Sequence, residues 1–354
     1  MKCINQLMIK SNVLIVGSGL AGLSAALELK KQGVEDVVVI ERMSGGQFEH
    51  YHRTCGEAIS DRMIRLSGMD KGCIVRKVNF TIITCGDVDI RVRSKGAIID
   101  RVSLLESMRE RCGAKVVKGS VRAVEEVEDG FIVITDTEEY SCRYLIGADG
   151  AFSVVRKCLF GYSPDVKMAA VNNLVKGDSD TDELHFTVSP QYPGSYRWDF
   201  PSKDGLRSVG YIKGTDDLTD YEEQGIRFIV TGNKGTVVRN NCCLVGDAAI
   251  LINPLCYGGI GVALLSGKKA ADGIARNDLS RYQRWIRKSI LFDHHFMDAY
   301  NTFKSWDQSE FEDAVAPFRN SSSMLLLKGA YAMMRRPKWA NVYTSIWMGF
   351  KRCW

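Results

Sequence analysis

Continuous apolar runs that end in glycine or an acidic residue recur through the first three quarters of the chain. The run Asn12–Val16 leads into a glycine-rich turn and a helical segment, and the next run ends at Glu41. Two further runs end at Asp149 and Asp247, and a long helical segment of small residues follows the second of them. Short runs of this kind are typical of strands that are buried on both faces. The pattern predicts an α/β fold.

The first turn has the spacing of a dinucleotide-binding loop. Gly17, Gly19 and Gly22 form G-x-G-x-x-G between a strand and a helix. The first glycine permits the turn, the second lets a pyrophosphate approach the backbone, and the third lets the helix pack closely. The helix N-terminus favours phosphate, and Glu41 at the end of the second strand can accept a hydrogen bond from a ribose hydroxyl. We therefore expect a dinucleotide cofactor.

An alternation of aromatic residues marks a different kind of strand, in YPGSYRWDFP (192–201). Tyr196, Trp198 and Phe200 share one face if this segment is extended. Pro201 has no N–H to donate, which predicts a strand end or edge. The alternation fits both a strand that packs aromatics into a core and one wall of an apolar tunnel.

Composition narrows the class of protein. The 354 residues are 45% apolar and 25% charged, and the net charge of +5 is dispersed, which predicts about two globular domains and no nucleic-acid partner. The 11 cysteines have no zinc or disulfide spacing, which favours reduced thiols and a cytoplasmic location. We expect no signal peptide and no transmembrane segment. No metal site is expected, because His50 and His52 lack further ligands and the adjacent pair 294–295 would not share a helix face.

Three motifs together resemble those of FAD enzymes of the para-hydroxybenzoate hydroxylase type. They are the glycine loop, GADGAFSVVR around Asp149 and LVGDAA around Asp247. The resemblance implies an FAD cofactor whose ribityl and ribose portions contact both aspartates. It also implies that the backbone of Gly258, Gly259 and Ile260 faces the isoalloxazine ring and the pyrophosphate. A helix N-terminus in this place stabilises the negative charge of a reduced flavin.

A second set of motifs resembles the geranylgeranyl reductase family, including its archaeal digeranylgeranylglycerophospholipid reductases. The set comprises Y-x-W-x-F-P at 196–201 with Pro193 before it, RTCGEAIS around Cys55, and IIDRVSLLESM around Arg101. The resemblance implies FAD-dependent saturation of isolated double bonds in geranylgeranyl lipids or related prenyl compounds. It places Cys55 beside the flavin and Arg101 near the cofactor. Its substrate-binding residues would be Tyr196, Trp198, Phe200 and Pro201.

The chain departs from this family at three places. Ile250 stands where a glycine usually follows GDAA, and Cys256 occupies a threonine-like position in the flavin loop. The Gly-x-Gly that usually follows the aromatic motif is replaced by GYI at 210–212. The change at 210–212 concerns the shape of the pocket end.

The motifs divide the chain into three parts. We expect a Rossmann-like three-layer FAD-binding domain in 1–160 and 236–275, with 44–95 contributing in part to the substrate side. An antiparallel-sheet substrate domain is expected in 161–235, and a helical C-terminal cap in 276–354. From Met324 onward the cap has six basic residues, several aromatic residues and no acidic ones. That composition fits a packed cap and also a surface that lies on anionic lipid at the inner face of a membrane.

The implied reduction needs a proton as well as a hydride, because an isolated prenyl double bond cannot stabilise a carbanion. Cys55 is the first candidate donor, since a buried thiol stays protonated, and Glu57 is an alternative. A redox pair of Cys55 with Cys256 is also open. The aromatic faces of Tyr196 and Trp198 would stabilise positive charge at the tertiary carbon. Cys55, Tyr196 and Trp198 are therefore the candidate catalytic residues.

The reductant and the reaction class retain alternatives. No second G-x-G-x-x-G marks a nicotinamide domain, so the electron donor is either NAD(P)H that binds transiently or a ferredoxin. An aromatic monooxygenase or halogenase shares the FAD motifs but requires oxygen. A non-catalytic flavoprotein is a third possibility, because a fold does not by itself establish a reaction.

Overall fold

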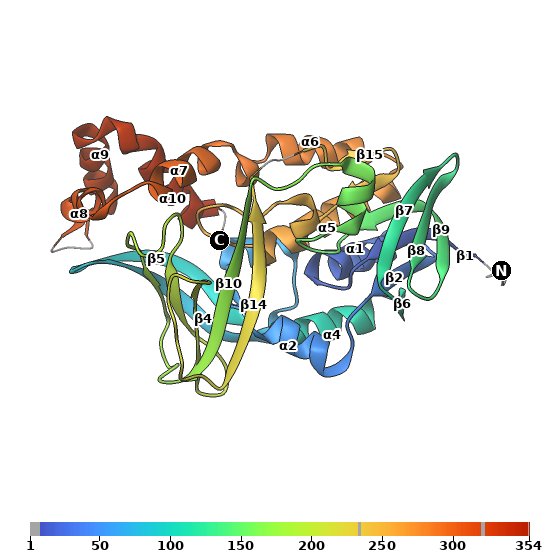
Figure 1. Ribbon diagram of the computed structural model, residues 1–354, viewed down its shortest axis with the longest axis horizontal. Helices are drawn as coiled ribbons and strands as arrows, with labels where there is room; N and C mark the ends of the chain where they lie inside the picture. Colours follow the sequence, from blue (N-terminus) through green and yellow to red (C-terminus); the bar gives the residue numbers. More distant parts are fainter. Residues whose placement is uncertain (1–7, 233–234, 320–322, 353) are drawn as a thin grey trace.

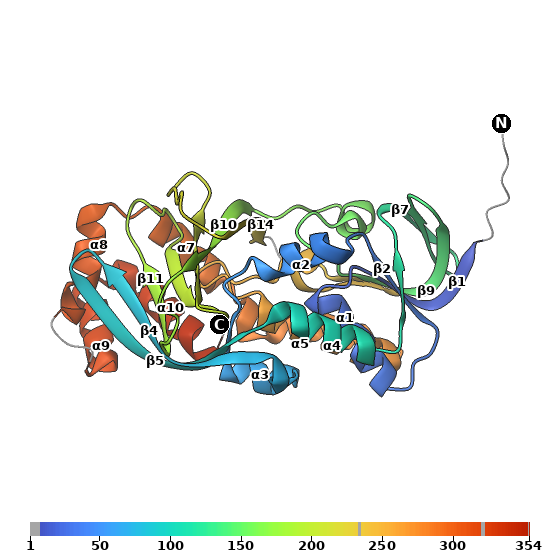
Figure 2. The same cartoon turned by 90° about the horizontal axis from the view of Figure 1, so that it is seen from below.

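The computed structural model describes residues 8–232, 235–319, 323–352 and 354. Within these residues, two eight-stranded sheets lie side by side along the longest axis of the molecule. Helices of the C-terminal region cover the end of the second sheet that is farthest from the N-terminus (Figures 1 and 2).

The first sheet is built on parallel strands, as the apolar runs predict. Its centre is β1 (Ile9–Val16), which pairs in parallel with both β2 (Val37–Glu41) and β9 (Glu139–Gly147). In spatial order the main path is β15 (Val238–Arg239), β16 (Cys242–Leu244), β9, β1, β2 and β6 (Lys115–Lys118), and the antiparallel hairpin β7 (Val121–Val127) and β8 (Gly130–Thr135) joins it at β9. The carboxyl ends of the parallel strands carry the glycine loop and the acidic residues, which therefore meet at one edge.

Three helices cover this sheet. Helix α1 (Leu20–Lys31) packs on β1 and β2 and is flanked by α4 (Arg101–Arg111) and α5 (Ile260–Ala275). The Ser24 hydroxyl on α1 donates a hydrogen bond to the Leu264 carbonyl on α5 at 2.7 Å. The small residues of α5 thus allow a close approach of two helices whose N-termini point toward the same sheet edge.

The second sheet carries the aromatic strand at its centre. Its order is β14 (Glu223–Thr231), β10 (Val166–Lys176), β13 (Leu206–Ile212), β12 (Arg197–Pro201), β11 (Glu183–Thr187), β4 (Ile74–Cys85), β5 (Val88–Ile99) and β3 (Ala58–Ser60). All neighbours are antiparallel except β11 and β4, which are parallel. Strand β12 is an interior strand that ends at Pro201, so the proline marks a strand end and not an edge.

The remaining helices link the sheets and form the cap. They are α2 (Gly45–Arg53), α3 (Asp61–Ser67), α6 (Ser280–Lys288), α7 (His295–Lys304), α8 (Gln308–Val315), α9 (Leu325–Arg335) and α10 (Ala340–Arg352). A separate apolar core, which includes Trp306, Phe311 and Trp339, ties the cap to the hairpin end of β4 and β5. Among the described residues, no helix is both long enough and apolar enough to cross a membrane.

Candidate functional site

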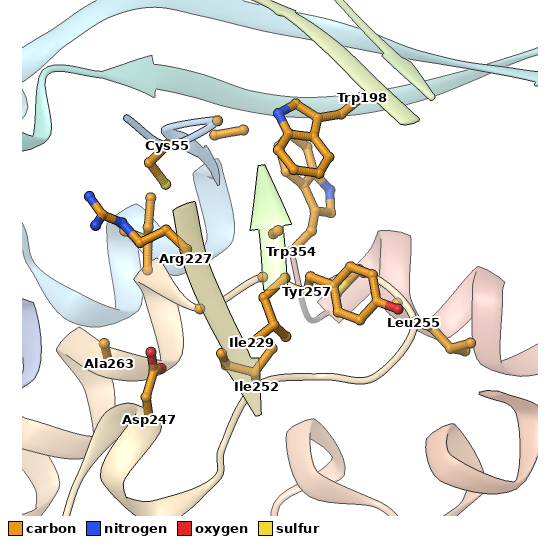
Figure 3. Close-up of a pocket in the computed structure, with 18 of the residues that line it drawn as sticks. Cys55, Trp198, Arg227, Ile229, Asp247, Ile252, Leu255, Tyr257, Ala263 and Trp354 are labelled. Atoms are coloured by element: carbon orange, nitrogen blue, oxygen red, sulfur yellow. The ribbon is translucent and has the colours of Figure 1, made fainter. Parts of the chain in front are cut away.

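One cavity of about 1600 Å³ runs between the two sheets and continues under the helical cap. Its walls include the glycine loop of the first sheet, the aromatic strand of the second sheet, and helices α9 and α10. Pockets for a single small ligand usually measure roughly 300–1000 Å³. The cavity therefore has room for a cofactor and a second long molecule, and Figure 3 shows part of its lining.

The glycine loop forms a cradle at the edge of the first sheet. Gly17 has a φ of +102°, and a Cβ there would lie 2.4 Å from the Ala148 carbonyl oxygen, so only glycine fits. Gly22 lies inside the turn against the Gly17 carbonyl and does not line the cavity, in keeping with its expected packing role. Gly19 is the N-cap of α1, and a Cβ on it would enter open space. That open space in front of a helix N-terminus suits the pyrophosphate of a dinucleotide.

Glu41 is held in place at the end of β2. One carboxylate oxygen accepts hydrogen bonds from the Ser18 backbone N–H at 2.8 Å and the Ser18 hydroxyl at 2.9 Å, and the other accepts from the Met43 N–H at 2.8 Å. The residue also lines the cavity. A carboxylate offers about four acceptor positions, so one stays available to a ribose hydroxyl.

A second helix N-terminus and an acid meet in the middle of the cavity. Gly259 is the N-cap of α5, and Gly258, Gly259 and Ile260 all line the wall. The Asp247 carboxyl points into the same space (Figure 3). Burial raises the pKa of Asp247 to about 6, although nearby arginines oppose that shift. The group is an acceptor facing a large cavity, which fits the hydroxyl-bearing portion of a cofactor.

Asp149 lines the cavity and also accepts hydrogen bonds from the segment that follows it. Its carboxylate accepts hydrogen bonds from the Ser153 hydroxyl at 2.5 Å and the Val154 backbone N–H at 2.6 Å. Arg156 is buried and donates to the Ala248 carbonyl at 2.8 Å, next to Asp247. These contacts hold the two acidic turns against each other. Contact of Asp149 with the cofactor stays a prediction.

The aromatic strand forms the wall opposite the glycine loop. Tyr196, Trp198 and Phe200 all line the cavity, and Phe186 on β11 packs edge-on against both Tyr196 and Phe200. Pro201 is buried and is not among the residues that line the cavity, so its contact with the substrate stays a prediction that the cavity lining does not favour. Its position follows from its lack of an N–H, because it ends the strand.

Two residues fix the orientation of Trp198. Its indole Nε1 donates to the Asn172 side-chain oxygen at 3.1 Å. The ring lies flat over Gly210, where a Cβ would come within 1.9 Å of the indole. The first glycine of the GYI segment is thus required by the tryptophan. Because the indole N–H donates its hydrogen bond to Asn172, Trp198 presents only its apolar ring to the cavity.

The same network reaches the cysteine loop. The Ser208 hydroxyl is 2.7 Å from the Asn172 side-chain oxygen and 3.3 Å from the Cys55 carbonyl oxygen. Cys55 follows α2 and lines the cavity, near Arg227 in Figure 3. Cys55 and Cys256 are both free thiols. Asn172 and Ser208 therefore position the thiol loop and the indole relative to each other.

Glu57 is a second acid in this part of the wall. It has a φ of +54°, which is uncommon for a residue with a side chain, and it lies 5% exposed. Its carboxyl accepts a hydrogen bond from the Arg101 backbone N–H at 2.9 Å. Burial raises the pKa of Glu57 to about 7, in spite of that hydrogen bond and of the nearby Arg101 charge. At neutral pH the group can hold a proton inside the cavity.

The chain is similar in sequence to several known proteins. Residues 14–175 match the family described as pyridine nucleotide-disulphide oxidoreductase. A digeranylgeranylglycerophospholipid reductase 2 of Methanosphaera stadtmanae is 28% identical, over 91% of this chain and 96% of the relative. The digeranylgeranylglycerophospholipid reductase of Thermoplasma volcanium is 27% identical, over 80% of this chain and 85% of the relative. The chain is therefore similar over most of its length to digeranylgeranylglycerophospholipid reductases, and the matches indicate an FAD-dependent oxidoreductase.

Solved structures confirm the fold. A geranylgeranyl bacteriochlorophyll reductase-like protein of Thermoplasma acidophilum has a TM-score of 0.76 and 20% identity, covering 94% of this chain and 98% of that one. A probable FAD-dependent monooxygenase of Pseudomonas aeruginosa has a TM-score of 0.66 and 16% identity, covering 85% of this chain and 98% of that one. The α/β architecture with an inserted sheet and a helical cap is therefore shared with these solved proteins, and the matches together point to a flavin cofactor.

The cavity also contains a basic cluster that no sequence motif predicts. The Arg227 guanidinium on β14 lies 3.4 Å above the ring of Tyr51 and close to Arg101, and burial lowers its pKa to about 10. His52 is 6% exposed, and neither ring nitrogen has a hydrogen-bond partner among the described residues. Burial and three arginines hold the pKa of His52 far below its usual range, so it is neutral. A buried neutral histidine without partners beside arginines fits an anionic cofactor group.

Two residues between the turn of Asp247 and α5 have the left-handed backbone conformation. Ile250 has a φ of +57°, the left-handed conformation for which glycine is favoured, and it stands where the family usually has glycine. Tyr257 has a φ of +48°, and its neighbour Cys256 accepts a hydrogen bond from the Tyr196 hydroxyl at 2.7 Å. Trp354 packs against the cluster that contains Trp198 (Figure 3). Of the departures noted in the sequence, Cys256 lines the cavity, whereas Ile250 and residues 210–212 do not.

A group of possible metal ligands lies outside the cavity. The ligand atoms of Asp293, His294 and His295 come within 4.8 Å of one another, at the start of α7. The two imidazole rings are 4.2 Å apart because His294 precedes the helix, so the prediction that they cannot face together is wrong. Both histidines are exposed, and no other feature of the described residues marks a bound ion there.

The raised pKa of Glu57 predicts a pH-dependent stability. A carboxyl whose pKa rises from 4.5 to about 7 on folding stabilises the fold below its unfolded pKa and loses that contribution as the pH rises through 7. We expect the free energy of unfolding to fall by about 2–3 kcal/mol between about pH 5 and 8, relative to Glu57→Gln. Glutamine keeps the acceptor for Arg101, so it is the matched control. Parallel pH profiles from denaturant unfolding would refute the assignment.

Proposed function

We propose that this reductase uses FAD to saturate isolated double bonds in the isoprenoid chains of membrane lipids, with geranylgeranyl lipids as the substrate class. One observation carries the proposal. The dinucleotide cradle and the aromatic wall belong to a single cavity that continues under the cap. A cavity of this length suits a long, flexible apolar chain, and relatives that cover most of this chain are named as digeranylgeranylglycerophospholipid reductases.

The donor set fits FAD. Gly19 and Gly259 stand at two helix N-termini on the cavity, and Glu41 lies where an adenosine ribose would approach. Asp247, His52 and the arginines supply polar groups nearer the middle. When bound and reduced, the flavin would supply the hydride.

The residues of the aromatic wall have two tasks. Tyr196, Trp198 and Phe200 exclude water and hold the prenyl chain against the cofactor side of the cavity. Addition of a proton to a trisubstituted double bond develops positive charge on the tertiary carbon, and an aromatic face stabilises such charge by roughly 0.5–2 kcal/mol. Because Asn172 holds the indole N–H, Trp198 presents its ring to the cavity.

The proton comes from the cysteine loop. Cys55 is the proposed donor, since it lines the cavity and its loop lies beside the aromatic strand, with Gly56 packed against Phe200. Glu57 lies two residues further on and can retain a proton near neutral pH, so it is the alternative donor or the reserve that reprotonates the thiol. NAD(P)H or a ferredoxin would restore the electrons after each reduction.

Product analysis tests the proposal. The protein, loaded with FAD and reduced anaerobically, is mixed with a detergent-dispersed geranylgeranyl glycerophospholipid, and mass spectrometry follows the lipid. A gain of two hydrogens per double bond supports reduction. An unchanged lipid together with hydroxylation of an aromatic substrate after admission of oxygen would support the monooxygenase alternative instead.

A further inference from the structure

Helix α9 has an exposed apolar face at the end of the molecule opposite the N-terminus (Figure 1). Leu327, Tyr331 and Met334 recur at helical spacing and are 67%, 55% and 73% exposed, and Leu326 beside them is 68% exposed. Soluble proteins rarely expose several large apolar side chains together. A face of this kind needs a partner.

The neighbouring stripe of the same helix lines the cavity. Leu325, Gly329 and Met333 lie on the cavity wall, again at helical spacing. Leu326 on α9 and Trp347 on α10 are both exposed and also line the cavity. The cavity therefore opens to the surface along α9, and the exposed apolar face forms the rim of the opening.

The charge around the rim is positive. Residues 307–354 contain seven basic and four acidic side chains, and no acidic residue occurs after residue 323. Arg335 and Arg336 share the single carboxylate of Asp313, and Lys338 pairs with Glu310. These ion pairs neutralise part of the positive charge. Apolar contact would therefore supply most of the free energy of binding to a partner, and the remaining net charge would favour an anionic one.

We propose that α9 docks the reductase on an anionic lipid bilayer, with Leu327, Tyr331 and Met334 inserted among the lipids. A prenyl chain then moves from the bilayer over the rim into the cavity without crossing water. The route of the chain rests on the proposed function, whereas the docking does not. A second copy of this chain is a less suitable occupant, because a protein seated on the rim would close the opening.

Vesicle flotation tests the docking. The FAD-loaded protein is mixed with vesicles of phosphatidylcholine and phosphatidylglycerol, and the bound fraction is compared with that of L327S/M334S. Neither substituted residue lines the cavity, so flavin content should not change. We expect partitioning of the variant to fall at least tenfold, about the loss from withdrawing two large apolar side chains from the membrane interface. Vesicles of phosphatidylcholine alone should bind the wild type more weakly.

The control is L66S/V127S, which removes two exposed apolar side chains on α3 and β7. It should bind vesicles like the wild type. Equal losses in both variants, or a wild type that stays unbound, would overturn the proposal. A wild type that sediments as a dimer, becomes monomeric in L327S/M334S and does not float would assign the rim to a contact between copies.

A substitution at Gly329 tests the role of the cavity opening separately from membrane docking. A Cβ at this position would meet no atom within 4 Å, so Gly329→Phe can project into the opening without a clash at its base. We expect it to float like the wild type and to reduce vesicle-embedded lipid at least tenfold more slowly. Gly329→Ala, which adds only a methyl group, should retain the rate. If the wild type floats with vesicles but does not reduce the lipid, docking stands and the proposed function is refuted. If it reduces the lipid in detergent but does not float, the proposed function stands and docking is refuted.

Discussion

Cys55→Ala should lower the rate at which the lipid reoxidises the reduced flavin by about 10²- to 10⁴-fold, the usual range for loss of a general acid. The double bond cannot accept a hydride alone, so the reaction stops where no proton is delivered. The side chain is small and lies at the cavity wall, and alanine should leave the loop contact from Ser208 to the Cys55 carbonyl intact. Anaerobic stopped-flow absorbance at saturating lipid measures the rate.

Two further variants decide between the candidate donors. Cys55→Ser keeps a protic group and should retain more of the rate than alanine. Glu57→Gln should have a modest effect if the glutamic acid only reprotonates the thiol. A normal rate in Cys55→Ala with a large loss in Glu57→Gln would move the donor to Glu57, whose pKa of about 7 predicts a rate that falls as the pH rises above 7.

Trp198→Leu should lower the same rate by about 3- to 30-fold, and more than it weakens lipid binding. Loss of one aromatic face from a developing cation removes roughly 0.5–2 kcal/mol of transition-state stabilisation, whereas leucine still offers an apolar surface to the chain. Stopped-flow traces over a range of lipid concentrations separate the limiting rate from the apparent affinity.

Trp198→Phe is the matched control, because it keeps an aromatic face and loses the hydrogen bond to Asn172. It should retain most of the rate. An effect of Trp198→Leu that is confined to affinity would show that the wall only binds the chain. Equal losses in both variants would show that the orientation set by Asn172 is what matters.

The cofactor half of the site could be predicted because its signals are local in sequence. Gly17 and Gly19 stand in one turn, Glu41 ends β2, and Asp247 lies in the turn just after β16, at the same edge of the sheet. The alternation at Tyr196, Trp198 and Phe200 likewise follows from the two-residue period of a strand. These features can be predicted without knowing which strands pair.

The rest depends on contacts between distant segments. Arg227 on β14 contacts the ring of Tyr51 on α2. Asn172 on β10 accepts a hydrogen bond from the indole of Trp198 on β12, two strands away in the sheet. No spacing in the sequence predicts either contact. Gly210 is required because the indole of Trp198 lies against it, a contact between two different strands. Pro201 stands next to these aromatic residues in the sequence, but it ends the strand and does not line the cavity. The cap composition fits a packed cap and a lipid-facing surface equally, and the exposed side chains of α9 support the proposed docking.

The most direct measurement of the central claim is a single-turnover experiment without oxygen. The bound FAD is reduced with dithionite, a geranylgeranyl glycerophospholipid is added, and flavin absorbance and lipid mass are followed together. The account predicts that the flavin reoxidises while the lipid gains hydrogen in pairs, with both changes slowed in Cys55→Ala. A flavin that stays reduced beside an unchanged lipid, in protein whose FAD is fully bound, would contradict it.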